Sequence, residues 1–418
     1  MSESRGEAAR WRIADKYWMA KTTPLNIHTV TFQPKNEENQ DRIIVERWSI
    51  GGDRWLLLAV CDGHFGSATA EYVFKTLPTS LHKKIRSFMY RQMQNNKLDR
   101  TNIHEFGARF TTALKEHIER FDRDIGEALK DICLNPEDLT EADARELIER
   151  HMDVIVRAFQ GTTLALALVN LDHRFMWAAG VGDSTVALST VGSDGKRKAE
   201  RLCELHTYKN PKEYYRAVMA HSYDEQPLLD WEDRMLGWLA VPRAIGDFAL
   251  KFRASYLTNL FNFTPYGDTF RILKYAPKIV TPPYVIAEPS VRFVDLEPIW
   301  GEQNKLLLFT DGVDNLVDGN LVFNPEKHSG ANPVDIVSAL LSDEVDPEVQ
   351  RVLGHPIDPH WSGDVDNKAI DILGNLLGGT DVERLEMVTD EERLRDTGEG
   401  WPFHIDDTSI IVWGLADV

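Results

Sequence analysis

The sequence lacks several features that mark secreted and membrane-spanning proteins. Its 418 residues include only three cysteines, and Cys61, Cys133 and Cys203 are too widely spaced for a disulfide framework or a zinc-binding motif. No run approaches 18 consecutive apolar residues, so no membrane-spanning helix is expected. The first ten residues contain no apolar segment and mix acidic with basic side chains, which argues against a secretory signal. We therefore expect an intracellular protein in a reducing compartment.

Positive charge is also scarce. The chain has 47 Lys and Arg residues against 66 Asp and Glu residues, which gives a formal net charge of −19 at pH 7. Nucleic acids and anionic membranes are bound through Lys and Arg, so neither is expected as a partner. The hydrophobic fraction of 43% is sufficient for a large buried core.

Short β-rich runs are spread over nearly the whole chain. Most are bounded by Gly, Asp, Asn or Pro, as in the strands of an antiparallel sheet. The runs predicted as strands are 43–49, 55–61, 162–170, 175–179, 186–189, 285–287, 305–309 and 409–412. Because these runs reach from residue 43 to residue 412, one sheet system must use both ends of the chain. This distribution favours a single catalytic domain.

Helical periodicity separates the strands. Apolar residues at three- and four-residue spacing predict helices over 67–94, 105–130 and 367–377. A further helix is predicted to begin at Asn135-Pro136. Its expected apolar stripe consists of Ile148, Met152, Ile155 and Phe159. Long helices beside strands, without a regular βαβ alternation, favour a layered α+β sandwich.

Aspartates recur at the ends of the predicted strands. Asp62 and Asp311 follow strands, Asp183 lies between two apolar runs, and Asp41 and Asp406 precede strands. Any one Asp-Gly pair at a strand end is ordinarily a turn signal. Buried carboxylates are costly unless they are paired or bind a metal, and Mg²⁺ and Mn²⁺ prefer oxygen ligands. The joint pattern therefore favours a site for hard cations.

The segments around these aspartates resemble the protein phosphatase 2C type of metal-dependent Ser/Thr phosphatases. The resemblance runs from about residue 28 to 415, and it is specific because weak motifs occur together in the family's order. The matching segments are Asn39–Asp41, Val60–Gly66, Gly161–Thr163, Ala179–Ser184, Ala240–Asp247, Pro282–Pro289, Phe309–Gly312 and Asp406–Ser409.

The resemblance implies a four-layer α/β/β/α sandwich with a central antiparallel β-sandwich and a binuclear Mg²⁺ or Mn²⁺ centre at one end. By position, Asp62 would bridge both cations, and the Gly63 carbonyl would bind one of them. Asp311 and Asp406 would complete the carboxylate shell of the other cation. Asp41 would act through metal-bound water.

A third, weaker cation is implied at Asp183, together with Asp311. The implied reaction is hydrolysis of phosphoserine or phosphothreonine by a hydroxide that bridges the two metals. Asp62 and His64 would be the catalytic residues, with His64 as the general acid for the leaving oxygen. A loop histidine bonded to a carboxylate is the structural alternative for His64.

The chain departs from the family's pattern where the substrate phosphate would bind. An arginine usually lies five residues before the aspartate that matches Asp41, but this sequence has Asn36, with Lys35 beside it. Asparagine lacks the charge and the two-pronged geometry of arginine, so Lys35 is the expected substitute. Thr185 also replaces a frequent arginine. These differences motivate an alternative, a weak or inactive phosphatase fold that acts as a binding scaffold; a hydrolase of small phosphoesters is a third reading.

The predicted organisation is an N-terminal extension, 1–27, and one catalytic domain, 28–418, with inserts near 252–281 and 317–404. A long insert before Pro282-Pro283-Tyr284 and another after Asp311-Gly312 are similar to the pyruvate dehydrogenase phosphatase branch. This likeness makes a mitochondrial location an alternative to a cytoplasmic one. We expect a monomer that acts on a phosphoprotein.

Overall fold

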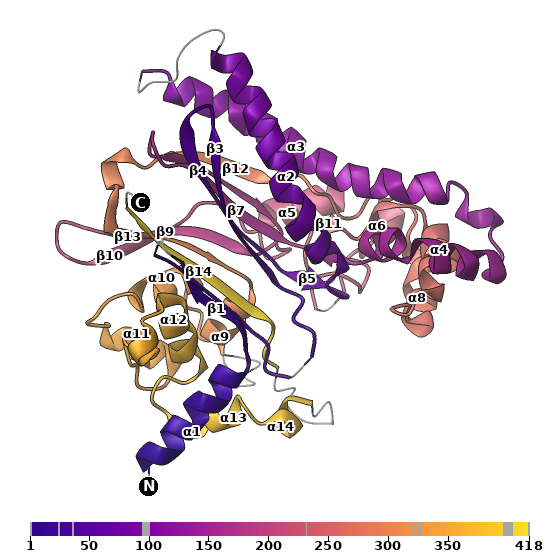
Figure 1. Ribbon diagram of the computed structural model, residues 1–418. Coiled ribbons are helices and arrows are strands. Elements are labelled where there is room, and N and C mark those ends of the chain that lie inside the picture. The colour runs from indigo at the N-terminus through magenta and orange to yellow at the C-terminus, as the bar shows by residue number, and fades with distance from the viewer. Residues whose placement is uncertain are drawn as a thin grey trace.

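The computed structural model describes residues 2–23, 26–35, 37–93, 101–230, 232–319, 322–323, 328–395 and 404–416. Two antiparallel sheets form its centre (Figure 1). The six-stranded sheet has the order β1 (Tyr17–Thr22), β2 (Ile27–Phe32), β14 (Thr408–Leu415), β13 (Gly301–Phe309), β9 (Thr185–Val191) and β10 (Arg197–Arg201). The five-stranded sheet has the order β12 (Ser290–Asp295), β8 (Phe175–Val181), β7 (Leu164–Asn170), β4 (Asp53–Cys61) and β3 (Arg42–Ile50).

The central strands are apolar on both faces because both faces are covered. All seven residues of β7 are buried. Successive side chains of a strand point to opposite faces. Accordingly, Leu166 and Leu168 pack into the core beneath the helices, whereas Ala165 and Ala167 pack into the core between the two sheets. Continuous apolar runs in the sequence therefore mark the middle of the sandwich.

Helices cover the outer face of each sheet, which completes four layers. The five-stranded sheet is covered by α2 (Ala68–Met93), α3 (Ile103–Ile132) and α4 (Glu141–Phe159). The six-stranded sheet is covered by α9 (Gly312–Asp318), α10 (Pro333–Ala339) and α12 (Lys368–Leu377). The predicted α/β/β/α sandwich is confirmed.

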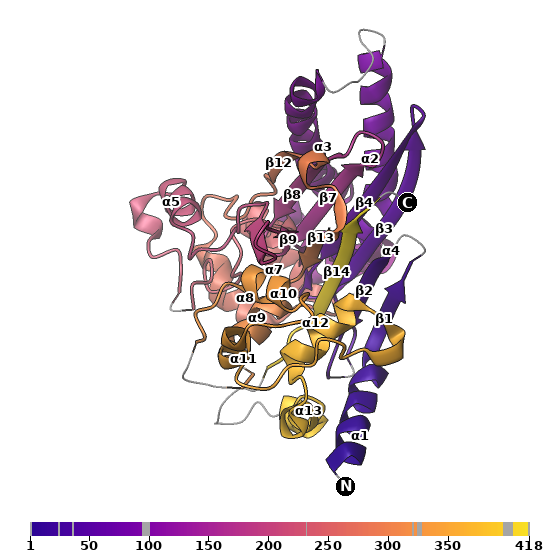
Figure 2. The ribbon, with the colours of Figure 1, turned by 90° about the vertical axis from the view of Figure 1, so that its left-hand side faces the viewer.

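Shorter elements complete the fold. A small sheet joins β11 (Ile245–Gly246), β6 (Gly161–Thr162) and β5 (Gly63–His64). The remaining helices are α1 (Ser2–Asp15), α5 (Pro211–Met219), α6 (Phe248–Lys251), α7 (Ala254–Asn259), α8 (Thr269–Tyr275), α11 (Pro347–Leu353), α13 (Val382–Met387) and α14 (Glu391–Arg395). Figure 2 shows α1 beside α13, and Arg5 of α1 pairs with Glu386 of α13 at 2.7 Å. None of the described helices combines the length and apolar composition that crossing a membrane requires.

Two details differ from the sequence-based expectations. The strand predicted at 285–287 is wrong, because Ile286 makes only an isolated bridge with Arg243 and the next strand begins at Ser290. Prolines at 282, 283 and 289 remove backbone donors around that segment. Asn135 and Pro136 begin only a short 3-10 helix, Pro136–Asp138, and the longer helix that was predicted there begins after Thr140, whose side chain caps it. Met152 is 37% exposed, since the helix is kinked at His151.

The predicted boundary between residues 27 and 28 stays a prediction. The strand β1 lies within the predicted extension, 1–27, and pairs with β2, so this part of the chain extends the six-stranded sheet.

Candidate metal centre

The predicted metal ligands lie where strand ends of both sheets meet. Asp62 connects β4 to the two-residue strand β5, and Asp183 connects β8 to β9. Asp311 lies between β13 and α9. Because β13 pairs with β9 and β4 pairs with β7, which itself pairs with β8, these loops meet at the same end of the sandwich. Antiparallel pairing thus brings residues more than a hundred positions apart to one place.

Three carboxylates form the centre of the site. Oxygens of Asp62, Asp183 and Asp311 all lie within 4.8 Å of one another, and the three residues are half-buried. They open into a cavity of about 340 Å³. Its polar lining includes Lys35, Gln40, Asp62, Gly63, His64, Asp183, Asp311, His404, Asp406 and Asp407. The structure therefore clusters three of the predicted ligands and places two more, Gly63 and Asp406, in the same cavity lining, whereas Asp41 is not among the lining residues.

The electrostatics of this cluster favour added positive charge. Burial raises the pKa of Asp62 well above its ordinary value, and the charges of Asp311 and Asp41 raise it further. Burial likewise raises the pKa of Asp311, with Asp183 adding to the effect. The pKa of Asp183 rises to about 7, mainly through burial. Cations among these groups would offset the cost of burying the charged carboxylates as well as their mutual repulsion.

Asp41 is fully buried beside the cluster. Its Oδ2 accepts a hydrogen bond of 2.9 Å from Thr310 Oγ1, which in turn accepts one of 2.9 Å from the Ser409 amide. Asp41 Oδ1 has no hydrogen-bond partner among the described residues. A buried carboxylate oxygen without a donor is costly, so this atom fits a cation or a water in the shell of a cation.

The donor set matches Mg²⁺ or Mn²⁺. The clustered ligands are carboxylate oxygens, which hard cations prefer, and no cysteine lines the cavity in the described part of the chain. The two histidines of the lining each face an aspartate: His64 contacts Asp247, and His404 lies near Asp406. The residues present therefore fit the predicted cation type.

His64 is held by Asp247 at the edge of the cavity. His64 Nε2 lies 2.7 Å from Asp247 Oδ2, and the Asp247 side chain is 1% exposed. A Cβ atom at Gly161 would lie 2.1 Å from both of these atoms, so the pair needs glycine at position 161. Asp247 ends the family-like segment Ala240–Asp247, and the structure gives it this specific partner.

His404 was missed by the sequence reasoning. Its Nδ1 lies 3.0 Å from Lys35 Nζ, and its Nε2 lies 3.7 Å from Asp406 Oδ2. Burial raises the pKa of Asp406, but His404, the Asp407 amide and the charge of Lys35 together outweigh this effect, and the pKa is lowered. His404 lies two residues before Asp406, and this proximity was the available signal. Asn36, the other predicted phosphate-binding residue, lies outside the described residues.

Arg201 and Asp314 were also missed. The Arg201 guanidinium donates to Thr185 Oγ1 and lies 3.8 Å from Asp314 Oδ1. Burial raises the pKa of Asp314 to about 7. The guanidinium of Arg201, on β10, therefore contacts Thr185, the residue that replaces the expected arginine. Asp314 is three residues after Asp311, a spacing that places both on one face of a helix.

Two neighbouring residues support the loops of the site. Asp407 Oδ2 accepts a hydrogen bond of 2.6 Å from the Gln40 amide, which ties the segment before β14 to the segment before β3. His206 is fully buried, and its Nδ1 accepts a hydrogen bond of 3.2 Å from the Gly182 amide. His206 is therefore a packed loop residue.

Known proteins resemble this chain in sequence. The sequence model of one family, described as Protein phosphatase 2C, matches residues 28–323. Pyruvate dehydrogenase (acetyl-transferring)-phosphatase 1, mitochondrial, of Bos taurus is 31% identical over 160 residues, which cover 37% of this chain and 28% of that protein. Pyruvate dehydrogenase (acetyl-transferring)-phosphatase 2, mitochondrial, of Homo sapiens is 26% identical over 236 residues, which cover 56% of this chain and 41% of that protein. The chain thus aligns with less than half the length of these relatives.

A solved structure agrees in fold. The crystal structure of serine-threonine phosphatase 2C from Toxoplasma gondii matches with a TM-score of 0.51 and 15% sequence identity. The match covers 94% of this chain and 96% of that chain. At this level of identity the similarity shows the shared fold.

Proposed function

Because the chain belongs to the protein phosphatase 2C family, we propose that it is a metal-dependent protein phosphatase that hydrolyses phosphoserine and phosphothreonine. The observation that carries this proposal is the meeting of Asp62, Asp183 and Asp311 within 4.8 Å of one another. These acids come from separate loops, have raised pKa values and form no ion pair with a basic side chain among the residues that the structure describes. Such a cluster is suited to cations and poorly suited to other ligands.

We assign two Mg²⁺ or Mn²⁺ ions to this centre and a third, weaker ion to the Asp183 side. Asp62, the Gly63 carbonyl, Asp311 and Asp406 would hold the first two, and Asp41 would act through their water shell. When bound, the two cations would lower the pKa of a shared water and offset charge on the phosphoryl oxygens.

The chain's own residues would act on the two ends of the scissile bond. His64 would protonate the seryl or threonyl oxygen as it leaves, and Asp247 would orient the ring through Nε2, so that Nδ1 is the nitrogen that hands over the proton. Lys35, in the cavity wall beside His404, would attract the substrate phosphate. As a point charge, Lys35 would hold phosphate with less directional preference than an arginine.

A direct assay tests this function. Hydrolysis of p-nitrophenyl phosphate and of a phosphothreonine peptide would be measured with Mn²⁺, with EDTA, and for Asp311→Asn. We expect EDTA to abolish turnover and Asp311→Asn to reduce kcat by about 100-fold or more, because metal ions contribute several kcal/mol of charge stabilisation. The exposed residue Asp224 provides the control variant Asp224→Asn, which should keep full activity. Turnover that survives chelation would contradict the proposal, and Mn²⁺ binding without turnover would indicate a binding scaffold.

The relatives support a proposal for the compartment and the substrate class. The pyruvate dehydrogenase phosphatases named above are mitochondrial. We therefore propose an intracellular, mitochondrial location and a phosphoprotein substrate, with the protein acting as a monomer. The predicted single catalytic domain over 28–418 is part of the same proposal.

A further inference from the structure

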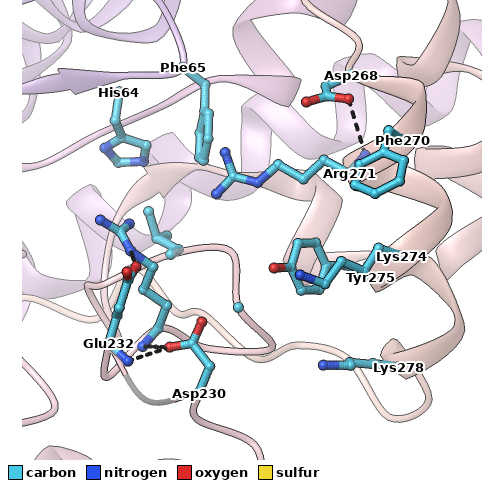
Figure 3. A pocket seen from close by; sticks show the side chains of 13 residues that line it. His64, Phe65, Asp230, Glu232, Asp268, Phe270, Arg271, Lys274, Tyr275 and Lys278 are labelled. Carbon is cyan, nitrogen blue, oxygen red and sulfur yellow. Dashed lines mark hydrogen bonds and ion pairs between the residues drawn. The ribbon is translucent and has the colours of Figure 1, made fainter. Parts of the chain in front are cut away.

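A second cavity adjoins the metal centre. It has a volume of about 770 Å³ and lies between the loop 232–239 and α8 (Figure 3). Its lining shares His64, Phe65, Arg234 and Leu239 with the metal-centre cavity. The two cavities are therefore parts of one groove, and a peptide with its phosphate at the metals would extend into the second part.

Three basic side chains line this second cavity from one side. Arg271 and Lys274 belong to α8, and Lys278 follows it. Figure 3 shows all three directed from the α8 side toward the side of His64. None of the three has a carboxylate within ion-pair distance among the described residues; each instead lies over an aromatic ring. Arg271 Cζ lies 4.8 Å from the ring centre of Trp238, and the Nζ atoms of Lys274 and Lys278 lie 4.9 Å and 5.2 Å from that of Tyr275.

The carboxylates of the same lining already have donors. Asp230 Oδ1 accepts from the backbone amides of Glu232 and Arg234 at 2.9 Å and 3.0 Å. Glu232 Oε2 accepts from Arg234 Nε at 3.2 Å, which neutralises the fourth cation of the cavity. Asp268 Oδ1 accepts from the Arg271 amide at 3.1 Å and caps α8. Four basic against three acidic side chains give this cavity an excess of one positive charge, although the whole chain carries a formal charge of −19.

The cavity wall is fixed before any ligand binds. Gly237 has φ +76°, and a Cβ atom there would lie 2.4 Å from the Tyr275 ring, so the loop backbone packs directly on α8. Arg271 Nη2 donates to the Trp238 carbonyl at 3.2 Å, which places its guanidinium near the shared residue Phe65, 5.4 Å from the ring centre. A preformed cationic site loses less conformational entropy when an anion binds.

We propose that this cavity binds acidic side chains, Asp or Glu, that flank the phosphorylated residue of the substrate. The inference rests on the proposed phosphatase function and adds a sequence preference to it. Arg271 offers the planar geometry that suits a carboxylate, and Lys274 and Lys278 provide mobile point charges at the outer edge. Complementary charge of this kind selects among partners more than it raises affinity overall.

Peptide pairs test the proposal. One phosphothreonine peptide carries three Glu residues on the N-terminal side of the phosphorylated residue, and a second carries them on the C-terminal side; each is compared with the same peptide containing Gln. The readout is the ratio of kcat/KM for the Glu peptide to that for its Gln counterpart. For at least one side we expect a ratio of about five or more, which Lys274→Gln/Lys278→Gln brings close to one, because each exposed ion pair contributes a small factor.

A matched control removes the same charge elsewhere. Lys83 on α2 and Lys196 between β9 and β10 are exposed, and neither lines the second cavity. Lys83→Gln/Lys196→Gln changes the net charge by the same amount and should keep the ratio of the unmodified protein. A loss of preference in this control as well would overturn the assignment to the cavity, since the effect would then be one of overall charge.

The outcomes separate this inference from the function on which it rests. Equal turnover of Glu and Gln peptides by the unmodified protein, or equal losses for both in the double variant, would overturn the acidic preference and leave the phosphatase intact. If no ester were turned over, the phosphatase proposal would fail, and anisotropy of the fluorescein-labelled Glu peptide would still decide the cavity. A Kd for this peptide that is raised by Lys274→Gln/Lys278→Gln and not by the control variant supports the cavity as the binding site. A Kd that Lys274→Gln/Lys278→Gln leaves unchanged overturns it.

Discussion

At the scale of single residues, the pair of His64 and Asp247 depends on the small size of a third residue. The two side-chain atoms approach to 2.7 Å above the backbone of Gly161, where any Cβ atom would lie 2.1 Å from each. Asp247 is buried and has a left-handed φ of +54°, an uncommon conformation for aspartate. Such backbone strain persists only where the surroundings hold it. Asp247 is therefore best described as a positioning residue for His64.

This arrangement predicts a selective effect of Gly161→Ala. The added methyl group should displace His64 from Asp247, so kcat for a phosphothreonine peptide should fall by about 10- to 100-fold, since general acid catalysis contributes at least this much. Hydrolysis of p-nitrophenyl phosphate should fall much less, because p-nitrophenolate leaves without a proton. Asp247→Asn should show the same split between the substrates.

Gly6→Ala is the matched control, since a Cβ atom at Gly6 would make only an ordinary contact of 3.4 Å. Mn²⁺ affinity, measured by calorimetry, should be unchanged in all three variants. Equal slowing of both substrates by Gly161→Ala would show that the glycine supports the metal centre rather than the proton donor.

At the scale of elements, the long helices α2 and α3 meet at a titratable contact. His117 Nε2 on α3 lies 3.0 Å from Ser80 Oγ on α2. Burial lowers the pKa of His117 to about 4, and the positive charges of Lys84 and Arg120 contribute to the shift. The histidine is therefore neutral in the folded protein at pH values where it is protonated in the unfolded chain.

This shift predicts how acid weakens the fold. A histidine with a lowered folded pKa contributes its full stability above pH 6.5 and loses it as the pH falls from 6.5 toward about 4. Near pH 5.5 the loss should be about 1 kcal/mol after allowance for solvent screening. Urea unfolding of the unmodified protein and His117→Gln at a series of pH values measures it. The free-energy difference between them should shrink as the pH falls, and a constant difference would refute the assignment.

The elements differ in how well their sequences predict them. Strands that are covered on both faces, such as β4 and β7, are continuous apolar runs and were predicted. The edge strands are not continuous apolar runs and were not predicted: β10 has the sequence RKAER, and β12 is only half-buried. The central strand β2 was also missed, because its polar residues find partners only in the folded protein. For example, His28 Nδ1 accepts a hydrogen bond from the Lys368 amide of α12 at 3.2 Å.

The same distinction holds for the metal centre. Its aspartates could be predicted because strand ends and glycines mark them in the sequence. Arg201, His404 and the basic side of the second cavity could not, because their roles depend on which loops the sandwich brings together. Local sequence identifies side chains that could take part in binding or catalysis, whereas tertiary packing decides which of them share a site.

At the scale of the whole molecule, the sandwich acts as a rigid frame for acids that are remote in the sequence. Asp41 and Thr310 are 269 residues apart, yet they share a hydrogen bond, and Gln40 and Asp407 are 367 residues apart and do the same. Two antiparallel sheets with helices on both outer faces hold these loops. Burial and mutual repulsion raise the pKa values of the carboxylates that these loops bring together. Bound cations would relieve both effects.

The central claim, that these carboxylates hold cations, can be tested by anomalous diffraction from crystals grown with Mn²⁺. We predict strong peaks at the manganese edge in contact with Asp62, Asp311 and Asp406, a weaker one beside Asp183, and loss of the strong peaks in Asp62→Asn. Manganese that binds elsewhere on the protein, with no peak among these aspartates, would contradict the account.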